Sequence, residues 1–321
     1  MRAVVHKKYG PPEVAVLTEV EKPVPQGNEL LVKVYASTVN RTDSGFRSAE
    51  YFISRFWSGL FKPKYQILGC EFAGVVESIG KDVTLFKSGD KVFGFNEATF
   101  GGHAEYLTVS EDKALTYMPS NVDYYHAAPI SEGAFYALNI IKAANVHAGQ
   151  QVLINGATGA IGSAGVQLLK YFGAQVTAVC NTKNIDLVKS LGADHVIDYQ
   201  NQDFTKIDKT FDFIFDAVGK SSFGMCKPLL KEKGVYISTE LGKGAQNVFL
   251  ALLTPILGGK KVLFPIPEIK KTDIEFLAER VLKEEYKPVI EKEYTLDQVV
   301  DAYRYVETGQ KTGNVVVRVV E

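Results

Sequence analysis

The 321-residue sequence has few cysteines and no long apolar run. Its three cysteines (Cys70, Cys180 and Cys226) lie far apart, which argues against a disulfide framework and indicates a reducing compartment. The opening residues, MRAVVHKKYG, lack the apolar run of a signal peptide. The longest apolar stretch, residues 248–257, is broken by a Thr-Pro pair and is too short to span a bilayer. These absences predict a cytoplasmic protein that is not inserted in a membrane.

The sequence also lacks an excess of charge of either sign. Lys and Arg number 36, Asp and Glu number 37, and both signs are mixed along the chain. This balance argues against nucleic acid, or any other polyanion, as a partner. With 46% hydrophobic residues, a chain of this length can form two globular domains, each with its own core.

Residues 1–122 contain short strand patterns without helical alternation. Strands are predicted at 3–5, 29–35 (ELLVKVY), 74–79, 91–95 (KVFGF) and 104–109, separated by turns rich in Gly and Pro. This spacing predicts a compact, mostly antiparallel β-barrel. Residues 47–65 differ, because they carry six aromatic residues between polar ones. They fit either a helical excursion that packs its own small core or a lid that closes over an apolar substrate.

From residue 123 the pattern changes to alternating helices and strands. Strands are predicted at 151–154, 175–179, 194–198, 211–215, 235–239 and 261–264, and helices at 128–142, 185–191 and 221–230. Further helices are predicted at 272–285 and at 297–307, the latter with an apolar stripe, before a closing strand at 314–319. Successive β–α units predict a parallel, doubly wound sheet whose ligand crevice lies at the carboxyl ends of the strands. The expected domains are therefore 1–122 with 266–321, and an inserted cofactor domain at 123–265.

The stretch QVLINGATGAIG at 151–162 carries the clearest functional pattern. An apolar strand leads into a glycine-containing turn, and residues 163–172 follow as an amphipathic helix. Gly159 would let a pyrophosphate approach the backbone, Gly162 would let helix and strand pack closely, and the helix N-terminus would offer N–H groups to phosphate. A strand-turn-helix without a ligand is the alternative. The predicted contacts are made by Ala157, Thr158, Gly159, Ala160, Ile161 and Gly162.

The end of the next strand favours a phosphorylated dinucleotide. An NAD enzyme would place a carboxylate there, whereas this chain has Asn181, Thr182 and Lys183. A 2′-phosphate fits this position better than a free 2′-hydroxyl, because no carboxylate repels it and hydroxyl and amino donors lie beside it. NADP(H) is therefore the predicted cofactor. A solvated lysine is the alternative for Lys183. The crevice rule adds residues that follow later strands: Gly219, Thr239, Phe264 and Ile266.

Several stretches spread along the chain carry a family resemblance. They are YGPPEV at 9–14, VNRTD at 39–43, LGCEFAGVVESIG at 68–80, GDKVFGF at 89–95, GATGAIG at 156–162 and LGADHVIDY at 191–199. Together they resemble the medium-chain dehydrogenase/reductase superfamily, and more closely its zinc-free quinone oxidoreductase (zeta-crystallin-like) branch. The resemblance implies an α/β protein with a GroES-like, mostly-β barrel domain and a Rossmann domain that uses NADPH. It also implies that Tyr199 packs beside the adenosine 2′-phosphate, with an ordinary strand-end aromatic as the alternative.

The resemblance also bears on zinc. Zinc alcohol dehydrogenases of this superfamily carry ligands where Asn40 and Cys70 stand, and a third thiolate is expected near Ala128, where this chain has no cysteine. A catalytic zinc needs three N, S or carboxylate ligands and an open position, which Cys70 and Glu71 alone do not provide. We therefore predict a metal-free enzyme in which hydride adds to a conjugated system and a few donors stabilise the charge on oxygen.

Two catalytic residues are implied by the resemblance. Asn40 corresponds to a residue beside the nicotinamide, where its amide can donate to a ligand oxygen; an amide that caps the local backbone is the alternative. Tyr51 resembles a tyrosine of the substrate pocket that acts in some relatives as the proton donor. Tyr65 competes for this role, and structural packing is the alternative for either tyrosine.

The chain departs from the family at two points. Gly133 stands where many quinone reductases have a threonine near the nicotinamide, and Glu132 beside it is an unexpected acid. A C-terminal Gly-Lys pair becomes Gly313-Asn314, which removes a cation that helps to hold phosphate.

These features predict an NADPH-dependent, metal-free reductase of quinones or α,β-unsaturated carbonyl compounds, with a small apolar electrophile as substrate. An enoyl-thioester reductase and a zinc-type alcohol dehydrogenase-like enzyme are alternatives of the same class. An NADPH-binding protein with little turnover, acting as a structural, sensing or RNA-binding protein, is the alternative from another class. The apolar stretch 248–257 follows the fifth predicted sheet strand, near where relatives dimerise, so a homodimer is a further expectation.

Overall fold

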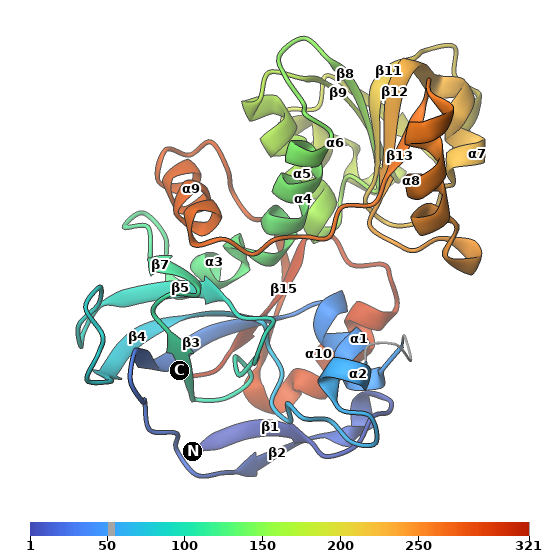
Figure 1. Ribbon diagram of the computed structural model, residues 1–321. Helices are drawn as coiled ribbons and strands as arrows, with labels where there is room; N and C mark the ends of the chain where they lie inside the picture. Colours follow the sequence, from blue (N-terminus) through green and yellow to red (C-terminus); the bar gives the residue numbers. More distant parts are fainter. Residues whose placement is uncertain (51–54, 321) are drawn as a thin grey trace. The chain divides into compact units, whose positions relative to one another are not determined.

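The computed structural model describes residues 1–50 and 55–320, apart from the side chain of Trp57 (Figure 1). It divides into two compact units. Unit 1 comprises Met1–Glu132, Ile269–Glu284 and Pro288–Glu321, and unit 2 comprises Gly133–Glu268 and Glu285–Lys287. The main borders lie at 132/133 and 268/269, where the sequence predicts 122/123 and 265/266. Residues 123–132 stay with unit 1 because they contact its sheet.

Unit 1 is built mainly on antiparallel strands. Its described strands are β1 (Arg2–His6), β2 (Ala15–Glu19), β3 (Glu29–Val39), β4 (Glu71–Ile79), β5 (Lys91–Phe95), β6 (Tyr106–Ser110), β7 (Ala114–Tyr117), β14 (Ile290–Thr295) and β15 (Asn314–Arg318). β1 pairs with β2, and a larger sheet runs in the order β14-β15-β3-β4-β5-β7, with β6 paired to β3. The only parallel pair within these described strands is β14 with β15.

The closing strand β15 joins the end of the chain to the sheet of its first part. It lies between β14 and β3, and residues 315–318 pair antiparallel with residues 36–39. Its first four residues are buried, as expected for a strand that is covered on both faces. The sequence pattern misses β2, β7 and β14, because β7 is very short and β2 and β14 lack an apolar alternation.

Unit 2 contains a parallel sheet. Its described strands are β8 (Gln151–Asn155), β9 (Gln175–Cys180), β10 (His195–Asp198), β11 (Phe211–Asp216), β12 (Leu230–Ser238) and β13 (Lys261–Leu263). They lie in the order β10-β9-β8-β11-β12-β13, and each of these pairings is parallel. The doubly wound sheet predicted from the alternating pattern is therefore confirmed. The strand order reverses between β8 and β11, which creates a topological switch point at their carboxyl ends.

Helices cover the sheet of unit 2 (Figure 1). They are α4 (Glu132–Ala143), α5 (Ala160–Tyr171), α6 (Ile185–Ser190), α7 (Phe223–Cys226) and α8 (Gln246–Leu257). Leu153, Phe211, Ile214, Tyr236 and Val262 are buried together in one core cluster of this unit. Full burial of each aliphatic or phenylalanine side chain contributes about 1.5–3 kcal/mol to the stability of the fold. This core therefore holds in place the strands whose carboxyl ends carry the predicted cofactor residues.

Two predicted helices are shorter than their apolar spacing suggests. The helix expected over 128–142 is interrupted at Ser131, after a 3₁₀ turn at 128–130 and before α4. Ser131 donates from its backbone N and its Oγ to the Glu71 carboxylate, at 3.1 and 2.9 Å, so its polar groups are satisfied outside a helix. The helix expected over 221–230 shortens to α7 and a 3₁₀ turn that contains Pro228, and β12 then begins.

Unit 1 also has helices of its own among the described residues. They are α1 (Arg41–Ser48), α2 (Arg55–Ser58), α3 (Tyr124–Ala127), α9 (Lys271–Leu282) and α10 (Val299–Glu307). The apolar stripe predicted on α10 is buried, at Val299, Ala302, Tyr303 and Val306. Within residues 1–50 and 55–320, no helix combines the length and the apolar character needed to span a membrane.

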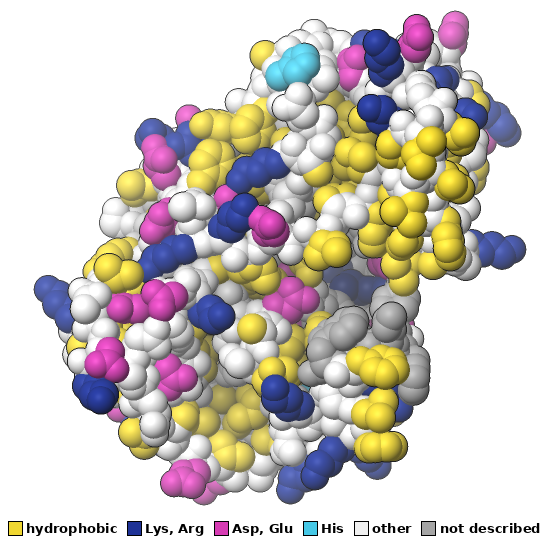
Figure 2. Space-filling model, in the orientation of Figure 1, with side chains coloured by type: hydrophobic (Ala, Val, Ile, Leu, Met, Phe, Trp, Pro, Cys, Tyr) yellow, Lys and Arg dark blue, Asp and Glu magenta, His cyan; other side chains and the backbone are white. Residues whose placement is uncertain are grey.

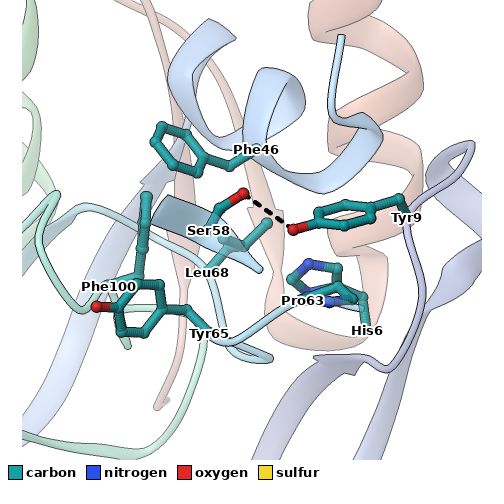
Figure 3. A pocket seen from close by; sticks show the side chains of 8 residues that line it. All are labelled: His6, Tyr9, Phe46, Ser58, Pro63, Tyr65, Leu68 and Phe100. Atoms are coloured by element: carbon teal, nitrogen blue, oxygen red, sulfur yellow. Dashed lines mark hydrogen bonds between the residues drawn. The ribbon is translucent and has the colours of Figure 1, made fainter. Parts of the chain in front are cut away.

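Part of the aromatic segment 47–65 lines a small pocket of unit 1 (Figure 3). The hydroxyl of Tyr9 is hydrogen-bonded to Ser58 Oγ at 2.9 Å. The ring of Tyr65 packs near that of Phe100, with centroids 6.1 Å apart. For Ser58 and Tyr65, the alternative in which this segment packs within unit 1 therefore fits. The alternative in which the segment forms a lid over the substrate stays a prediction.

Candidate cofactor and active site

The predicted cofactor-binding residues share one edge of the sheet of unit 2. Each of them follows the carboxyl end of a parallel strand, which is the edge that carries the switch point. After β8 stand Ala157, Thr158, Gly159, Ala160, Ile161 and Gly162; after β9, Asn181, Thr182 and Lys183; after β10, Tyr199; after β11, Gly219; after β12, Thr239; and after β13, Phe264 and Ile266. Strand pairing thus gathers residues that are widely separated in the sequence.

The turn between β8 and α5 has the geometry that a pyrophosphate requires. Gly159 is the N-cap of α5 and provides no side-chain cap for the N–H groups of its first turn. A Cβ added at Gly159 would meet no atom of the described residues within 4 Å. A Cβ added at Gly162 would lie 2.0 Å from the backbone oxygen of Gly156, so only glycine lets α5 pack this closely against the turn.

The end of β9 holds a buried acceptor without a partner. Asn181 Oδ1 is buried, and within the described part of the chain no donor lies on it. Such an atom costs free energy unless a ligand donates to it. Thr182 and Lys183 are exposed beside it, and Tyr199 is 54% exposed at the end of the adjacent strand β10. The three polar residues predicted to receive a 2′-phosphate thus lie next to Tyr199.

Sequence spacing misses one acid at this edge. Asp198, the last residue of β10, accepts a hydrogen bond from Thr182 Oγ1 at 2.5 Å. Hydrogen bonds, first from Thr182 and then from Gln200 and Asn201, hold the pKa of this carboxyl below its usual value. Asp198 comes close only because β10 pairs in register with β9, so nothing in the linear distance from Thr182 indicates it.

The later strands place their residues at the same edge with different exposure. Gly219 has a φ of +63°, in the left-handed region, and an added Cβ would lie 2.3 Å from Cγ of Glu240. Thr239 and Phe264 are half-buried, and Ile266 is 86% exposed. The open turn at Gly159, the N-terminus of α5 and the unpartnered acceptor of Asn181 together fit a dinucleotide.

In unit 1, Asn40 caps helix α1. Its Oδ1 accepts from the backbone N of Asp43 at 2.9 Å, and Asp43 Oδ2 accepts from the backbone N of Asn40 at 3.2 Å. The Asn40 amide also donates to Cys70 Sγ at 3.0 Å, and the side chain is buried. These contacts fit the alternative in which the Asn40 amide caps the local backbone. The catalytic role of Asn40 stays a prediction. Tyr51, the second predicted catalytic residue, lies outside the described residues.

A buried polar network surrounds Glu71 of β4. Its Oε2 accepts from Thr38 Oγ1 at 2.6 Å, and its Oε1 accepts from Ser131 Oγ at 2.9 Å, Ser131 N at 3.1 Å and Glu132 N at 2.6 Å. Burial raises the pKa of Glu71, and these hydrogen bonds oppose the shift because they stabilise the ionised form. The carboxyl is therefore well solvated by the protein itself.

Glu132 forms the second acid of this network. Thr42 Oγ1, on α1, donates to Glu132 Oε1 at 3.0 Å. Burial, followed by the negative charge of Glu71, raises the pKa of Glu132 to about 8, and the positive charge of Lys311 opposes this shift. The family resemblance marks Glu132 as unexpected, but Thr42 and Lys311 are far from it in the sequence, so only the tertiary structure identifies these partners.

The positions that resemble zinc ligands do not fit a catalytic zinc. Burial, followed by the charges of Asp43, Glu132 and Glu71, raises the pKa of the Cys70 thiol well above its usual value, whereas zinc binds a thiolate. Asn40 already donates an amide hydrogen to this sulfur. No group of three or more His, Cys, Asp or Glu side chains in the described ranges is arranged to hold a metal. Metal-free catalysis stays a prediction.

Comparison with known proteins gives two family matches. The alcohol dehydrogenase GroES-like domain matches residues 26–120, and the family described as zinc-binding dehydrogenase matches residues 191–317. The chain is 31% identical to the 2-methylene-furan-3-one reductase of Solanum lycopersicum over 99% of this chain and 79% of the relative. It is 30% identical to the chloroplastic NADPH-dependent alkenal/one oxidoreductase of Arabidopsis thaliana, again over 99% and 79%.

A solved structure extends this likeness to the whole fold. The quinone oxidoreductase from Coxiella burnetii superposes with a TM-score of 0.87 at 26% identity, over 100% of this chain and 99% of that one. The predicted combination of a GroES-like domain and a Rossmann domain is therefore confirmed. With these matches and the glycine turn at the switch point of unit 2, the chain belongs to the medium-chain dehydrogenase/reductase superfamily, in its quinone oxidoreductase branch.

Proposed function

We propose that this protein is an NADPH-dependent reductase that transfers hydride to quinones or α,β-unsaturated carbonyl compounds. The observation that carries this proposal is the dinucleotide turn of unit 2, with an open Gly159, the N-terminus of α5 and the unpartnered acceptor of Asn181. Relatives at 30–31% identity over 99% of the chain are named as reductases of this kind. They do not favour the thioester reductase, the alcohol dehydrogenase or the non-catalytic binding protein.

Each unit has its own part in this proposal. Bound NADPH would supply the hydride. In unit 2, the first N–H groups of α5 and the bare backbone at Gly159 would bind the pyrophosphate. Lys183 would bind the 2′-phosphate, and Thr182 would join it by turning its hydroxyl away from Asp198. Unit 1 is the catalytic domain, where donors stabilise the charge that gathers on the substrate's oxygen. A small apolar electrophile is the expected substrate.

The direct test measures NADPH and NADH oxidation with a panel of quinones, alkenals and enones. We expect turnover with NADPH and a clear preference for it over NADH. Lys183→Met should weaken NADPH binding and leave NADH binding unchanged, because only the 2′-phosphate faces the lost charge. Lys189→Met, at an exposed lysine of α6, is the matched control. Turnover with none of these acceptors, or a preference for NADH with simple alcohols, would contradict the proposal.

The predicted role of Asn40 can be separated from its capping role. Asn40→Ser keeps a side-chain oxygen that can cap α1 and removes the amide donor. If the amide stabilises charge on the substrate, kcat should fall by roughly 10²-fold, as for removal of one such donor, while the denaturation midpoint changes little. Wild-type kinetics in this variant would leave Asn40 with the capping role alone.

A homodimer is proposed for the exposed apolar face of α8. Its large exposed side chains are Phe249, Leu252, Leu253, Ile256 and Leu257. Figure 2 shows hydrophobic side chains gathered over this helix, and such a patch is characteristic of an interface. Sedimentation of the wild type and of Ile256→Lys should give a dimer and a monomer respectively. A monomeric wild type would refute the dimer.

The cytoplasmic compartment also stays a proposal. The name of the Arabidopsis relative places that protein in the chloroplast. The three cysteines described as free and buried are consistent with a reducing compartment. Fractionation of cells that express the full chain would test it, and recovery in an organelle would contradict it.

A further inference from the structure

Glu132 carries a buried carboxyl for which the proposed function so far has no use. It is the last residue of unit 1 and the first of α4, and it is 4% exposed. The hydroxyl of Thr42, two residues beyond the N-cap of α1, donates to its Oε1 at 3.0 Å. A buried carboxyl with a hydroxyl on it is the arrangement needed to store a proton and pass it on.

The neighbouring charges keep the proton on Glu132 rather than on Glu71. Glu71 accepts four hydrogen bonds, from Thr38, from two atoms of Ser131 and from the backbone of Glu132, and these favour its ionised form. Among the described residues, the donor on the Glu132 carboxyl is the Thr42 hydroxyl. When two buried carboxyls interact, the less well solvated one takes up the proton first.

The charged groups around Glu132 come from three further elements. Glu71 of β4 and Asp43 of α1 disfavour its ionised form, and Lys311, before β15, favours it. Burial lowers the pKa of Lys311 itself, and its Nζ donates to the carbonyl of Gly313 at 2.6 Å. The net effect is a Glu132 pKa of about 8, so the acid holds its proton at neutral pH.

Glu132 is the residue before Gly133, the first residue of unit 2. The following residue, Gly133, packs on the first residue of α5: a Cβ added at Gly133 would lie 2.7 Å from the backbone C and O of Ala160. Because consecutive Cα atoms are about 3.8 Å apart, the backbone of Glu132 lies one residue from that contact.

We propose that Glu132 is the proton source for reduction of an α,β-unsaturated carbonyl, and that the hydroxyl of Thr42 hands the proton to the substrate. This inference rests on the proposed function. Hydride addition to the β-carbon brings two electrons, and the C=C electron pair moves to leave an enolate. The Thr42 O–H bond then breaks and its proton bonds to the α-carbon, while the Glu132 O–H proton moves to the Thr42 oxygen. Glu132 is left as a carboxylate, which water reprotonates before the next turnover.

Infrared difference spectroscopy of the protein without cofactor tests the proton store directly. The carboxylic acid carbonyl band of the wild type should contain a component that disappears with a midpoint near pH 8. Burial raises the pKa of Asp43 to about 7, so its component should disappear separately, at lower pH. Glu132→Gln should lack this titration. Glu111→Gln is the matched control, because Glu111 is also a buried carboxyl of unit 1 that accepts from a threonine hydroxyl, Thr84, and it should keep the wild-type titration.

Turnover of 2-cyclohexenone with NADPH tests the transfer. The wild-type rate should fall above about pH 8 as Glu132 loses its proton. Glu132→Gln and Thr42→Val should be slower by roughly 10²-fold or more and lack this alkaline limb, with unchanged NADPH affinity. Thr42→Ser, which keeps the hydroxyl, should restore both the rate and the limb.

Each contrary result has a defined meaning. A Glu132→Gln enzyme with the wild-type rate and alkaline limb overturns the inference and leaves the proposed function intact. If Glu132→Gln does not fold, Thr42→Val decides in the same way. A wild type that binds NADPH but reduces no acceptor overturns the proposed function, and the inference with it.

Discussion

Two glycines of the dinucleotide turn allow ligand binding to be separated from packing. At Gly159, an added Cβ would meet nothing within 4 Å in the part of the chain that the structure describes, and φ is −70°, which any residue adopts. Gly159→Ala should therefore fold like the wild type. The new methyl group would instead occupy the space in which a pyrophosphate must approach the backbone.

Gly162 presents the opposite case. An added Cβ would lie 2.0 Å from the oxygen and 2.8 Å from the carbon of Gly156, and backbone atoms cannot rotate aside. Contacts under 3.0 Å are essentially never seen for a real Cβ, so helix and turn must separate by about 1 Å. Overpacking of this kind costs about 1–3 kcal/mol, whereas alanine in place of glycine inside a helix recovers at most about 1 kcal/mol. Gly162→Ala should therefore destabilise unit 2 by up to about 2 kcal/mol.

The assay combines urea denaturation with fluorescence titration of NADPH. Gly159→Ala should keep the wild-type denaturation midpoint and bind NADPH roughly tenfold or more weakly, a loss of about 1.4 kcal/mol. Gly162→Ala should lower both the midpoint and the affinity. Gly224→Ala, in α7, is the control, because among the described residues its Cβ would approach a single atom, Ser222 Oγ, at 4.0 Å. Its NADPH affinity should not change, and its midpoint should stay the same or rise slightly, since alanine is the better helix former.

One result would refute this reasoning. If Gly159→Ala bound NADPH as tightly as the wild type, the backbone at this position would not contact the pyrophosphate. The assignment of the turn between β8 and α5 as the phosphate site would then be wrong, whatever the stability of Gly162→Ala.

Four further predictions follow from the site residues. Asp43→Ala removes the acceptor of buried backbone N–H groups, at about 1–3 kcal/mol each, so the urea midpoint should fall clearly; an unchanged midpoint contradicts this. Lys311→Met removes the charge that opposes the raised pKa of Glu132, so the alkaline limb of enone reduction should move to higher pH, and a shift to lower pH would refute the pairing. The pKa of Glu132, about 8 against an ordinary 4.5, gives a contribution to stability that is full below about pH 4.5 and lost as the pH rises to about 8. Over this pH range the free energy of unfolding of Glu132→Gln should fall less than that of the wild type, by up to about 1.4 kcal/mol per pH unit. Equal pH dependence of the two free energies would contradict the raised pKa of Glu132. Asp198→Asn removes a carboxylate from beside Thr182 and should strengthen NADPH binding a few-fold without affecting NADH, which paired titrations would check.

The elements that sequence reasoning predicts well are those whose residues are contiguous. Strand β8, its glycine turn and α5 occupy one unbroken stretch, so apolar spacing and glycine positions suffice to indicate a dinucleotide turn. The same holds for the alternating strands and helices of unit 2, which predict a parallel sheet because each crossover must return to the same edge. The carboxyl-edge rule then places Asn181 and Gly219 near the turn without coordinates.

Other elements depend on residues that the sequence keeps apart. The helix expected over 128–142 breaks at Ser131 because Glu71, on a strand of the distant sheet, accepts both of its hydrogen bonds. Apolar periodicity contains no signal for this contact, since it reports which face of a segment is buried and not which partner it meets. The position of Asp198 cannot be predicted from the sequence for the same reason, because only strand pairing brings it beside Thr182.

The cofactor half of this protein can be identified from local sequence, because binding a phosphorylated dinucleotide needs backbone geometry that local glycines and strand ends encode. The role of the acid in unit 1 depends instead on how the chain folds. The proton affinity of Glu132 depends on burial and on the charges of Glu71 and Lys311, which reach it from a strand and a loop far away in the chain. Burial and long-range charge are properties of the folded state, and no spacing of residues in the sequence specifies them.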